Sequence, residues 1–535
     1  MIEHKHINKI IIALVLVAAL FTGIFATDSG LLGIESAYAE PEYASELFPE
    51  NEVVSIKIDA DADEWATMLE NATAEEFISC DITINGKTYK SVGIRPKGNS
   101  SLQSVASSES DRFSFKIKFD EYVDGQTCYG LSEMVINNMQ GDATNMKEYL
   151  SYDLFEQMGV DSPLCAYADI SVNEDPWGLY LAVETIDQEF AERVYGKDYG
   201  ELYKPESQDI GAGGGPGGER PEGMTKGAIT MKGQRPEGMT HGAIVMEGQR
   251  PEGMEGMPGG KGESGKGADL VYTDDNSESY SQIFDNAVFG ASASDKNKII
   301  RALKALSTGE NLEEYVDTEE VLRYFAVNTA LVNCDSYICS FKHNYYLYET
   351  DGKISILPWD LNLSFAGFQS NDATDAVNFA VDTPVVMGVS LAERPLIGTL
   401  LANEKYKNQY HEYLQEIVDD YFKSGYFEGE IDRLDALIGD YVKNDKTAFY
   451  TYDQYTKAVE TLKEFGALRA KSIAGQIEGS IPAAAELQKE DSKNLVDASG
   501  IKISDMGSQG GGTREGQGRG PEQGEDYFLP LNMRE

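Results

Sequence analysis

The sequence of 535 residues is poor in the side chains that many hydrolases use. It has five histidines, and beyond the first 40 residues only His241, His343 and His411 occur. Neither a G-x-S-x-G elbow nor an H-E-x-x-H motif is present. A Ser–His hydrolase and a zinc hydrolase are therefore disfavoured. Any metal chemistry should use oxygen ligands and a hard ion such as magnesium or manganese.

Cysteine is scarce as well. The five cysteines lie at irregular spacings and include no C-x-x-C pair; they are Cys80, Cys128, Cys165, Cys334 and Cys339. This number is too small for a disulfide scaffold in a chain of this length. We therefore expect most of the thiols to be free.

Positive charge is outnumbered two to one, because 45 Lys and Arg face 90 Asp and Glu, which gives a net charge of −45. A protein that binds the phosphate backbone needs clustered Lys and Arg to displace counterions. Nucleic acid is therefore not an expected partner. We interpret the acidity as a solubilising surface.

Only one long apolar run occurs, from Ile10 to Phe25. Lys5 and Lys9 precede it, and the small-residue sequence Ala-Tyr-Ala ends at residue 39. This pattern predicts a secretory signal peptide over residues 1–39, either cleaved or retained as an N-terminal anchor. No other stretch approaches the roughly twenty apolar residues of a membrane span. We expect an exported protein, extracellular, at the cell surface or spore-associated.

Two segments have low-complexity composition. Residues 207–267 contain "GAGGGPGG" and three copies of Arg-Pro-Glu-Gly-Met that start at Arg220, Arg235 and Arg250, which predicts a flexible insertion. Whether the repeats bind a partner is left open. Residues 482–535, with "SQGGGTREGQGRGPEQGED", are predicted to be a disordered acidic tail.

Two motifs resemble ligand sites but lack a required residue. The segment 260–267, "GKGESGKG", has glycine where a phosphate-binding loop needs the hydroxyl that holds magnesium, and no strand precedes it. The alternating aspartates at 59–63 imitate a calcium loop, but Glu64 stands where that loop requires glycine. A helix N-cap explains these aspartates better.

The periodicity of the remaining chain divides it into two regions. Residues 40–206 contain alternating segments with Asn-Gly turns, a helix over 145–158, and two strands around a Pro-Trp-Gly turn. Residues 268–481 contain helical stretches on either side of two strands, "HNYYLYE" and "KISILPWDLNLSF". The sequence therefore predicts an α+β protein with a β-rich N-terminal unit and a largely helical C-terminal unit.

The second of these strands carries polar residues in an apolar setting. If "PWDLNLSF" is a strand, Asp360 and Asn362 point to one face, and their Cα atoms are about 7 Å apart, close enough to flank one ion or two neighbouring ions. The alternative is that this face simply meets solvent. Upstream, Asp335 and Asn344 complete the order acid, amide, acid that protein kinases use for the hydroxyl acceptor and magnesium, although the gaps are longer than in those enzymes.

Six segments in order resemble the CotH family, the atypical protein kinases of spore coats. They are "RPKGNSS", "FSFKIKFD", "GLYLAVETID", "ELYKPE", "NYYLYE" and "PWDLNLSF", and the similarity spans residues 53–420 apart from the Gly-rich insertion. The resemblance implies a divergent protein-kinase-like two-lobe fold and ATP- and metal-dependent phosphorylation of protein serine. The cofactors implied are ATP and Mg²⁺ or Mn²⁺.

By the same resemblance, Asp335 matches the family's acid after the helix, and Asp360 matches its Pro-Trp-Asp metal ligand. Asn344 matches the asparagine that opens the intervening strand and is a second expected metal ligand. Asn362 departs from the family, because many members carry a second aspartate there; an amide still binds magnesium but brings less charge.

The N-terminal unit is then expected to bind the nucleotide. A turn with Gly98 lets backbone N–H groups approach phosphates, and further residues supply charge or sit at the lobe junction. The candidates are Arg95, Lys97, Lys116, Lys118 (the favoured strand lysine), Glu148 as its ion-pair partner, Glu184 and Lys204. The alternative is an ordinary hairpin with surface cations.

We thus expect phosphoryl transfer from ATP to Ser or Thr of an unknown exported, cell-surface or spore protein. The alternative is a non-catalytic surface or matrix module that retains the fold. A third, weaker hypothesis is transfer of a phosphoryl or nucleotidyl group to a glycan.

Overall fold

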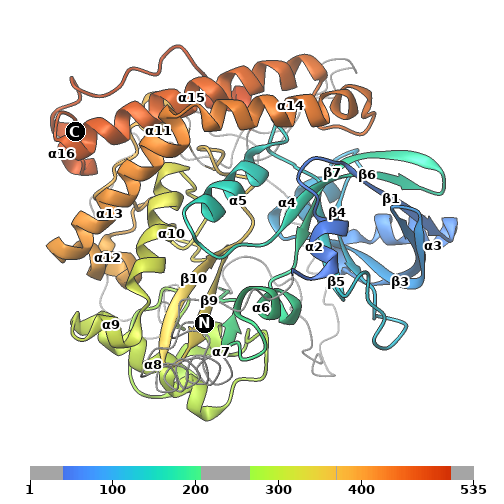
Figure 1. The fold of residues 1–535 in the computed structure, drawn as a ribbon, viewed down its shortest axis with the longest axis horizontal. Coiled ribbons are helices and arrows are strands. Elements are labelled where there is room, and N and C mark those ends of the chain that lie inside the picture. Colours follow the sequence, from blue (N-terminus) through green and yellow to red (C-terminus); the bar gives the residue numbers. More distant parts are fainter. Residues whose placement is uncertain (1–39, 207–265, 369, 371, 508–535) are drawn as a thin grey trace, which may run out of the picture.

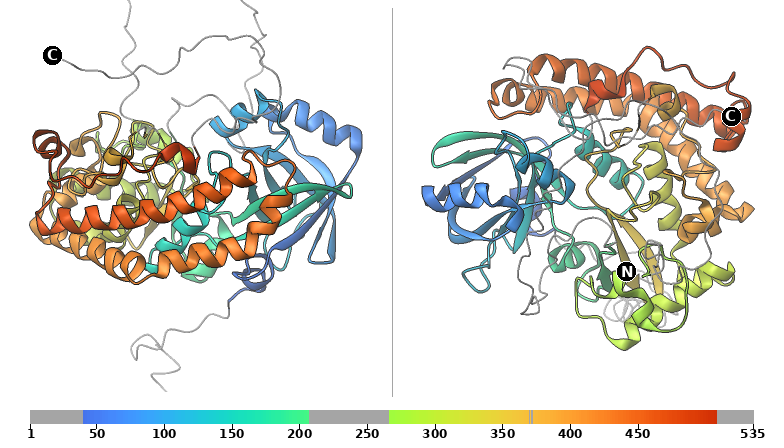
Figure 2. Two further views of the ribbon diagram at one scale, coloured as in Figure 1. Left: turned by 90° about the horizontal axis from the view of Figure 1, so that it is seen from above. Right: turned by 180° about the vertical axis from the view of Figure 1, so that it is seen from behind.

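The computed structural model describes residues 40–206, 266–368, 370 and 372–507 (Figure 1). The predicted signal peptide, most of the Gly-rich insertion with its repeats, and residues 508–535 lie outside this part. A β-rich region forms one side of the molecule and a helical region the other, and α5 (Lys147–Gln157) lies between them (Figures 1 and 2). The α+β class and the order of the two regions are as predicted.

The β-rich region is a closed barrel with strand order β1-β2-β3-β4-β5-β7-β6. Its strands are β1 (Val54–Ala60), β2 (Ile78–Ile84), β3 (Lys87–Lys97), β4 (Ser114–Lys118), β5 (Glu133–Asn137), β6 (Cys165–Val172) and β7 (Asp175–Glu184). The parallel pairing of β1 with β6 closes it, so that no strand edge is left open. Asn85 and Gly86, with φ of 49° and 87°, form the tight turn between β2 and β3 that the Asn-Gly pair predicts.

The barrel interior is apolar and is covered by short helices. α2 (Glu42–Leu47), α3 (Ala62–Glu70) and the 3₁₀ turn Ala72–Ala74 precede β2, and α4 (Ser100–Ala106) follows β3. Asp61 accepts hydrogen bonds from the backbone N–H groups of Asp63 and Glu64, so the N-cap interpretation of these acids is confirmed. Because α4 intervenes, Gly98 leads into a helix and does not form a tight turn between β3 and β4.

The helical region surrounds a second sheet of order β10-β9-β8. The strands are β8 (Glu201–Tyr203), β9 (Tyr345–Thr350) and β10 (Lys353–Pro358). The helices of this part of the chain are α6 (Gln188–Tyr195), α7 (Ser281–Phe284), α8 (Ala293–Thr308), α9 (Leu312–Tyr315), α10 (Thr318–Ala330), α11 (Ala373–Val377), α12 (Pro395–Leu401), α13 (Glu404–Glu416), α14 (Tyr426–Asn444), α15 (Tyr452–Glu478) and α16 (Ala485–Glu490). Short 3₁₀ turns lie at Ser277–Tyr280, Leu391–Glu393 and Ile503–Met506, and a π-helical turn over Ile417–Lys423 continues α13.

Three local predictions were wrong. The turn between β6 and β7 is formed by Asn173 and Glu174, both with positive φ, so Pro176 and Trp177 belong to β7. Strand β10 ends at Pro358, residues 359–361 are irregular with φ of 57° at Asp360, and residues 362–368 form turns. The two-faced alternation inferred for "PWDLNLSF" therefore does not exist, because this segment leaves the sheet before its polar residues begin.

The third error concerns the predicted tail. Residues 482–507 are folded against the helical region, with Val496, Ile501, Ile503 and Met506 buried. Met506 also accepts a hydrogen bond from the backbone N–H of Ala143, at 3.1 Å. Because these few apolar residues lie among many polar ones, the average composition of the segment resembles that of a disordered tail.

Other expectations concern export and redox state. All five cysteines are free, as predicted. Within the described ranges, no helix combines the length and the apolar character needed to cross a bilayer.

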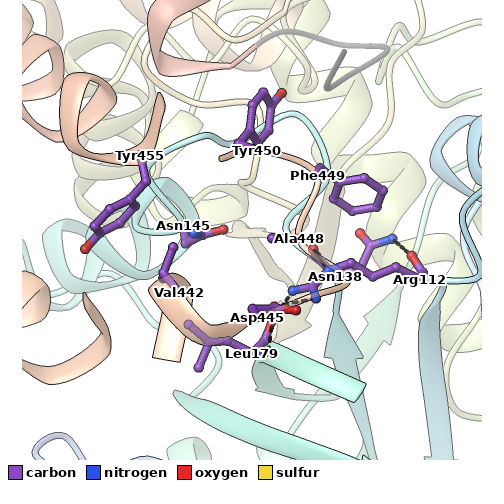
Figure 3. A pocket seen from close by; sticks show the side chains of 10 residues that line it. All are labelled: Arg112, Asn138, Asn145, Leu179, Val442, Asp445, Ala448, Phe449, Tyr450 and Tyr455. Carbon is purple, nitrogen blue, oxygen red and sulfur yellow. Dashed lines mark hydrogen bonds and ion pairs between the residues drawn. The ribbon is translucent and has the colours of Figure 1, made fainter. Parts of the chain in front are cut away.

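A buried ion pair joins the barrel to the helical region. Arg112, just before β4, lies 2.6 Å from Asp445, which follows α14, and both side chains are 3% exposed. Arg112 also donates to the carbonyl of Leu179 in β7, and Leu179 N–H donates to Asp445 at 3.0 Å (Figure 3). The orientation of the two regions is thus fixed by charges withdrawn from water.

Candidate active site

Lys97, the last residue of β3, directs its ammonium group to the junction between the two regions. The ammonium donates to the Asn137 side-chain oxygen at 3.3 Å and lies 5.8 Å from the centre of the Trp359 ring. Burial lowers the pKa of Lys97, and the negative charges of Asp360 and Glu148 act against that effect. A lysine from the barrel therefore faces acids from α5 and from the turn after β10.

Glu148, in the first turn of α5, is 2% exposed. The side-chain amide of Asn137 donates to its two carboxylate oxygens, at 3.0 and 3.1 Å. Burial, followed by the charge of Asp360, raises the pKa of Glu148 to about 8. Glu148 thus belongs with Lys97, and Asn137 connects the two; Lys118, the partner expected from the sequence, is paired elsewhere.

Lys204 brings a second positive charge to the same place. Its ammonium lies 5.8 Å from the ring centre of Tyr346 and 5.9 Å from that of Trp359, and 3.3 Å from Glu206. The Trp359 ring is thus close to two ammonium groups, and Asp360 follows it in the chain. Two lysines beside a partly buried carboxylate suit a phosphate group with a bound cation.

Asp335 lies in the loop after α10 and is held on two sides. His343 Nε2 is 2.7 Å from its Oδ1, and the Asn344 amide donates to its Oδ2 at 3.2 Å and to its backbone carbonyl at 2.9 Å. Burial lowers the pKa of His343, but hydrogen bonding to Asp335 and to Cys339 outweighs burial and raises this pKa to about 10. The Asp335 carboxylate is therefore fixed by a histidine that carries positive charge.

The sheet register brings the Asp335 and Asp360 loops together. Pro358 pairs with Tyr345, so Asn344 enters β9 at the point where the chain leaves β10 for Trp359. The N–H groups of Phe365 and Ala366 then donate to the carbonyls of residues 331 and 332, at 2.7 and 3.3 Å. The turn that carries Asp360 and Asn362 therefore packs along the segment that leads to Asp335.

The oxygen atoms of two asparagines remain suited to a cation. Asn344 uses its amide nitrogen to bind Asp335, and Asn362 donates its own to the carbonyl of Gln140 at 3.1 Å. With the nitrogen of each amide engaged, the oxygen of each remains as the atom for a ligand. These two amide oxygens and the Asp360 carboxylate are oxygen donors of the kind that magnesium and manganese prefer.

The other candidates occupy structural ion pairs. Arg95 pairs with Glu75, Lys116 with Glu133 at 2.7 Å, and Lys118 with Glu121 at 3.0 Å. Arg95 is directly opposite Lys116 in the sheet, two residues from Lys97 along the same outer face. Glu184 is fully buried and binds Tyr43 and Arg193 at the barrel edge. The structure does not join these side chains to Asp360 by any hydrogen bond or ion pair within the described residues.

Several residues of the site were not found from the sequence. Asn137 was missed because it is one of two asparagines that end an apolar strand, a common strand-end pattern. His343 was set aside because isolated histidines carry no motif, and Cys339 because it belongs to no C-x-x-C pair.

Comparison with known proteins identifies the family of the chain. A family model described as "CotH kinase protein" matches residues 94–473, which include both lysines and both aspartates of the site. An inner spore coat protein H-like protein of Bacillus subtilis (strain 168) is 25% identical over 109 residues, which is 20% of this chain and 34% of that protein. Because the family match spans well over half of the sequence, the chain belongs to the CotH kinase protein family.

Proposed function

We propose that the protein is a protein kinase with a divergent kinase-like fold, in which the barrel binds ATP and the helical region supplies the metal ligands and the catalytic acid. The reaction is transfer of the γ-phosphoryl group of ATP to Ser or Thr of a protein. Family membership supports this class of reaction. The proposal also agrees with charges that converge from both regions, since Lys97 ends β3 of the barrel, Lys204 follows β8, and Asp335 and Asp360 lie in loops of the helical region.

The observation that carries the proposal is the group of Lys97, Asn137, Glu148 and Asp360. A half-buried lysine bound through an amide to a helix glutamate, and facing an aspartate after a strand, suits the binding of ATP phosphates and magnesium. A merely structural ion pair needs only one acid. Here a second acid raises the pKa of the first, an arrangement that an additional cation would relieve.

The residues present fit a divalent cation. Asp360, Asn344 and Asn362 would hold it through oxygen, and magnesium or manganese bound there would neutralise charge on the β- and γ-phosphates. Lys97 and Lys204 would bind phosphate oxygens directly. Glu148 and Asn137 would keep Lys97 in place.

Asp335 would accept the hydrogen bond, and then the proton, of the acceptor hydroxyl. His343 and Asn344 hold its carboxylate in one orientation, at 2.7 and 3.2 Å, which keeps an oxygen lone pair directed to the acceptor. Positioning and electrostatics then account for catalysis without a histidine base.

The relative's name supports a proposal for the acceptor and for the location. Because a similar protein is named for the inner spore coat, we propose that the acceptor is a Ser- or Thr-containing protein of a spore or cell surface, and that the predicted signal peptide directs export.

The test is transfer of label from γ-labelled ATP, with Mg²⁺ or Mn²⁺, to the protein itself and to an added Ser-rich protein. We expect transfer by the wild type, and loss in Asp360→Ala and Asp335→Ala. Asp175→Ala, at an exposed position in the β6–β7 hairpin, is the matched control and should behave as wild type. No transfer, or equal transfer by all variants, refutes the kinase; transfer of label from the α-phosphate indicates nucleotidylation.

A non-catalytic module that retains the fold is the second candidate. The observation that favours it is Asn362, which brings no charge and donates its amide to Gln140. Under this alternative the protein binds ATP weakly or not at all, and no variant changes the label.

A further inference from the structure

A second group of possible ligands lies in the loop between α10 and β9. One donor atom each from Asp335, Cys339 and His343 falls within 4.8 Å of the other two. These residues recur every four positions along a single loop. Asp335 and Cys339 are buried, and His343 is partly exposed and so gives access from solvent.

The loop is held by its own backbone and by a buried arginine. The N–H of Cys339 donates to the carbonyl of Ser336 at 3.2 Å. Arg394, 3% exposed, donates to the carbonyls of Tyr337, at 2.7 Å, and of Cys339. The Cys339 side chain is therefore presented from a backbone that is already fixed, as a preorganised ligand requires.

The chemistry of these donors differs from that of the Asp360 group. Binding of a cation would release to solvent the proton of the His343 imidazolium and that of the Cys339 thiol. The resulting imidazole and thiolate favour a borderline-soft cation such as zinc, whereas carboxylate and amide oxygens favour magnesium. Three protein ligands with a fourth position for water form a common zinc arrangement. The 2.7 Å contact of Asp335 with His343 would open to about 3.3 Å, the edge of a tetrahedron with bonds of about 2.0 Å.

We propose that Asp335, Cys339 and His343 form a binding site for a zinc-type divalent cation, and that a cation bound there withdraws Asp335 from phosphoryl transfer. The carboxylate that would receive the acceptor proton then becomes a metal ligand. Zinc would thus inhibit the protein at a site separate from that of magnesium. The inhibition rests on the proposed function, whereas the binding does not.

Binding is tested with Co²⁺ as a spectroscopic probe on the full, reduced protein. We expect one Co²⁺ per chain, a near-ultraviolet thiolate-to-cobalt absorption band, and displacement by Zn²⁺. Cys339→Ser should lose the band, and His343→Gln should weaken binding at least tenfold. Cys128→Ser, at an equally buried cysteine in the barrel, should keep both the absorption band and the wild-type affinity for Co²⁺.

Absence of the thiolate band in the wild type, or its persistence in Cys339→Ser, overturns the site. If Cys339→Ser does not fold, unchanged affinity in His343→Gln overturns it equally. For the inhibition, Zn²⁺ at fixed Mg²⁺ should suppress label transfer, and Cys339→Ser, compared with its own rate without Zn²⁺, should need at least tenfold more Zn²⁺ for the same suppression. Equal suppression in both refutes the regulatory role, whereas no transfer under any condition refutes the kinase and leaves the cobalt result to stand alone.

Discussion

Asn137 donates its side-chain amide to both carboxylate oxygens of Glu148, at 3.0 and 3.1 Å, while its own oxygen accepts from Lys97 at 3.3 Å. The amide thus connects a lysine of the barrel to a glutamate of α5. This leaves the lysine bound to a neutral oxygen, with its charge directed to Asp360 and the site. The barrel and the acids are therefore coupled through one side chain.

Asn137→Leu should remove this connection. Because Glu148 would be left buried with no hydrogen-bond donor from Asn137, we expect the free energy of unfolding to fall by about 1–3 kcal/mol. We also expect ATP binding to weaken, since Lys97 loses its fixed position. Urea unfolding measures the first effect and ATP titration the second. If the free energy of unfolding and the affinity for ATP both stayed at wild-type values, the contact of Asn137 with Lys97 and Glu148 would have no role in stability or binding.

Lys97→Met should reduce label transfer about 10²–10³-fold, the usual effect of removing one preorganised charge from a reacting group. The fold should persist, because methionine replaces the aliphatic stem of lysine. Lys90→Met, which breaks an exposed ion pair with Asp81, is the control and should keep wild-type rates. Equal rates for Lys97→Met and the control would remove Lys97 from the site.

Glu320, near the start of α10, should make stability depend on pH. Burial, with the charges of Asp161 and Asp317, raises its pKa to about 8, whereas in the unfolded chain it titrates near 4.3. The folded state thus holds the extra proton, so the contribution of this group to stability is fully present below about pH 4.3 and is lost as the pH rises from there to about 8.

Glu320→Gln keeps the shape and removes the titration. Near pH 4 we expect the two proteins to have similar stability; at pH 9 Glu320→Gln should be more stable than the wild type by at least about 1 kcal/mol, since a change of one pKa unit corresponds to about 1.4 kcal/mol. Chemical unfolding of both proteins at the two pH values isolates this effect from the general charge repulsion that they share. A difference that does not change with pH would contradict the assignment.

Arg112→Met should be strongly destabilising, by about 3–5 kcal/mol, because Asp445 would be left as a buried charge without its partner. The matched control is Lys405→Met, which removes a pair with Glu313 whose side chains are 67% and 61% exposed, and it should change the free energy of unfolding much less. Thermal and urea unfolding provide the comparison. If both variants lost a similar free energy of unfolding, burial would not determine how much these ion pairs contribute to stability.

The sequence was informative where local patterns decide the structure. Asn85-Gly86 predicted its turn, Asp61 its helix N-cap, and Gly159 the end of α5, where it adopts a φ of 69°. Membership of the CotH kinase family was also correctly identified, from six short segments in order.

The sequence was less informative where distant contacts decide. The local sequence around the two lysines does not show that Lys97, and not Lys118, lies near Glu148. This choice depends on the register of β3 with β4 and on the position of α5. Similarly, β10 ends at Pro358 because its partner strand begins at Tyr345. The sequence alone did not indicate this end, because the apolar residues continue beyond Pro358. The functional roles of these residues stay predictions.

The most direct test of the central claim is calorimetric titration of the purified protein with ATP in the presence of Mg²⁺. The account predicts saturable binding by the wild type and by Lys90→Met, and binding at least tenfold weaker in Asp360→Ala. It also predicts weaker binding by the wild type when Mg²⁺ is removed. Equal affinity of the wild type and Asp360→Ala for ATP, with and without Mg²⁺, would contradict it.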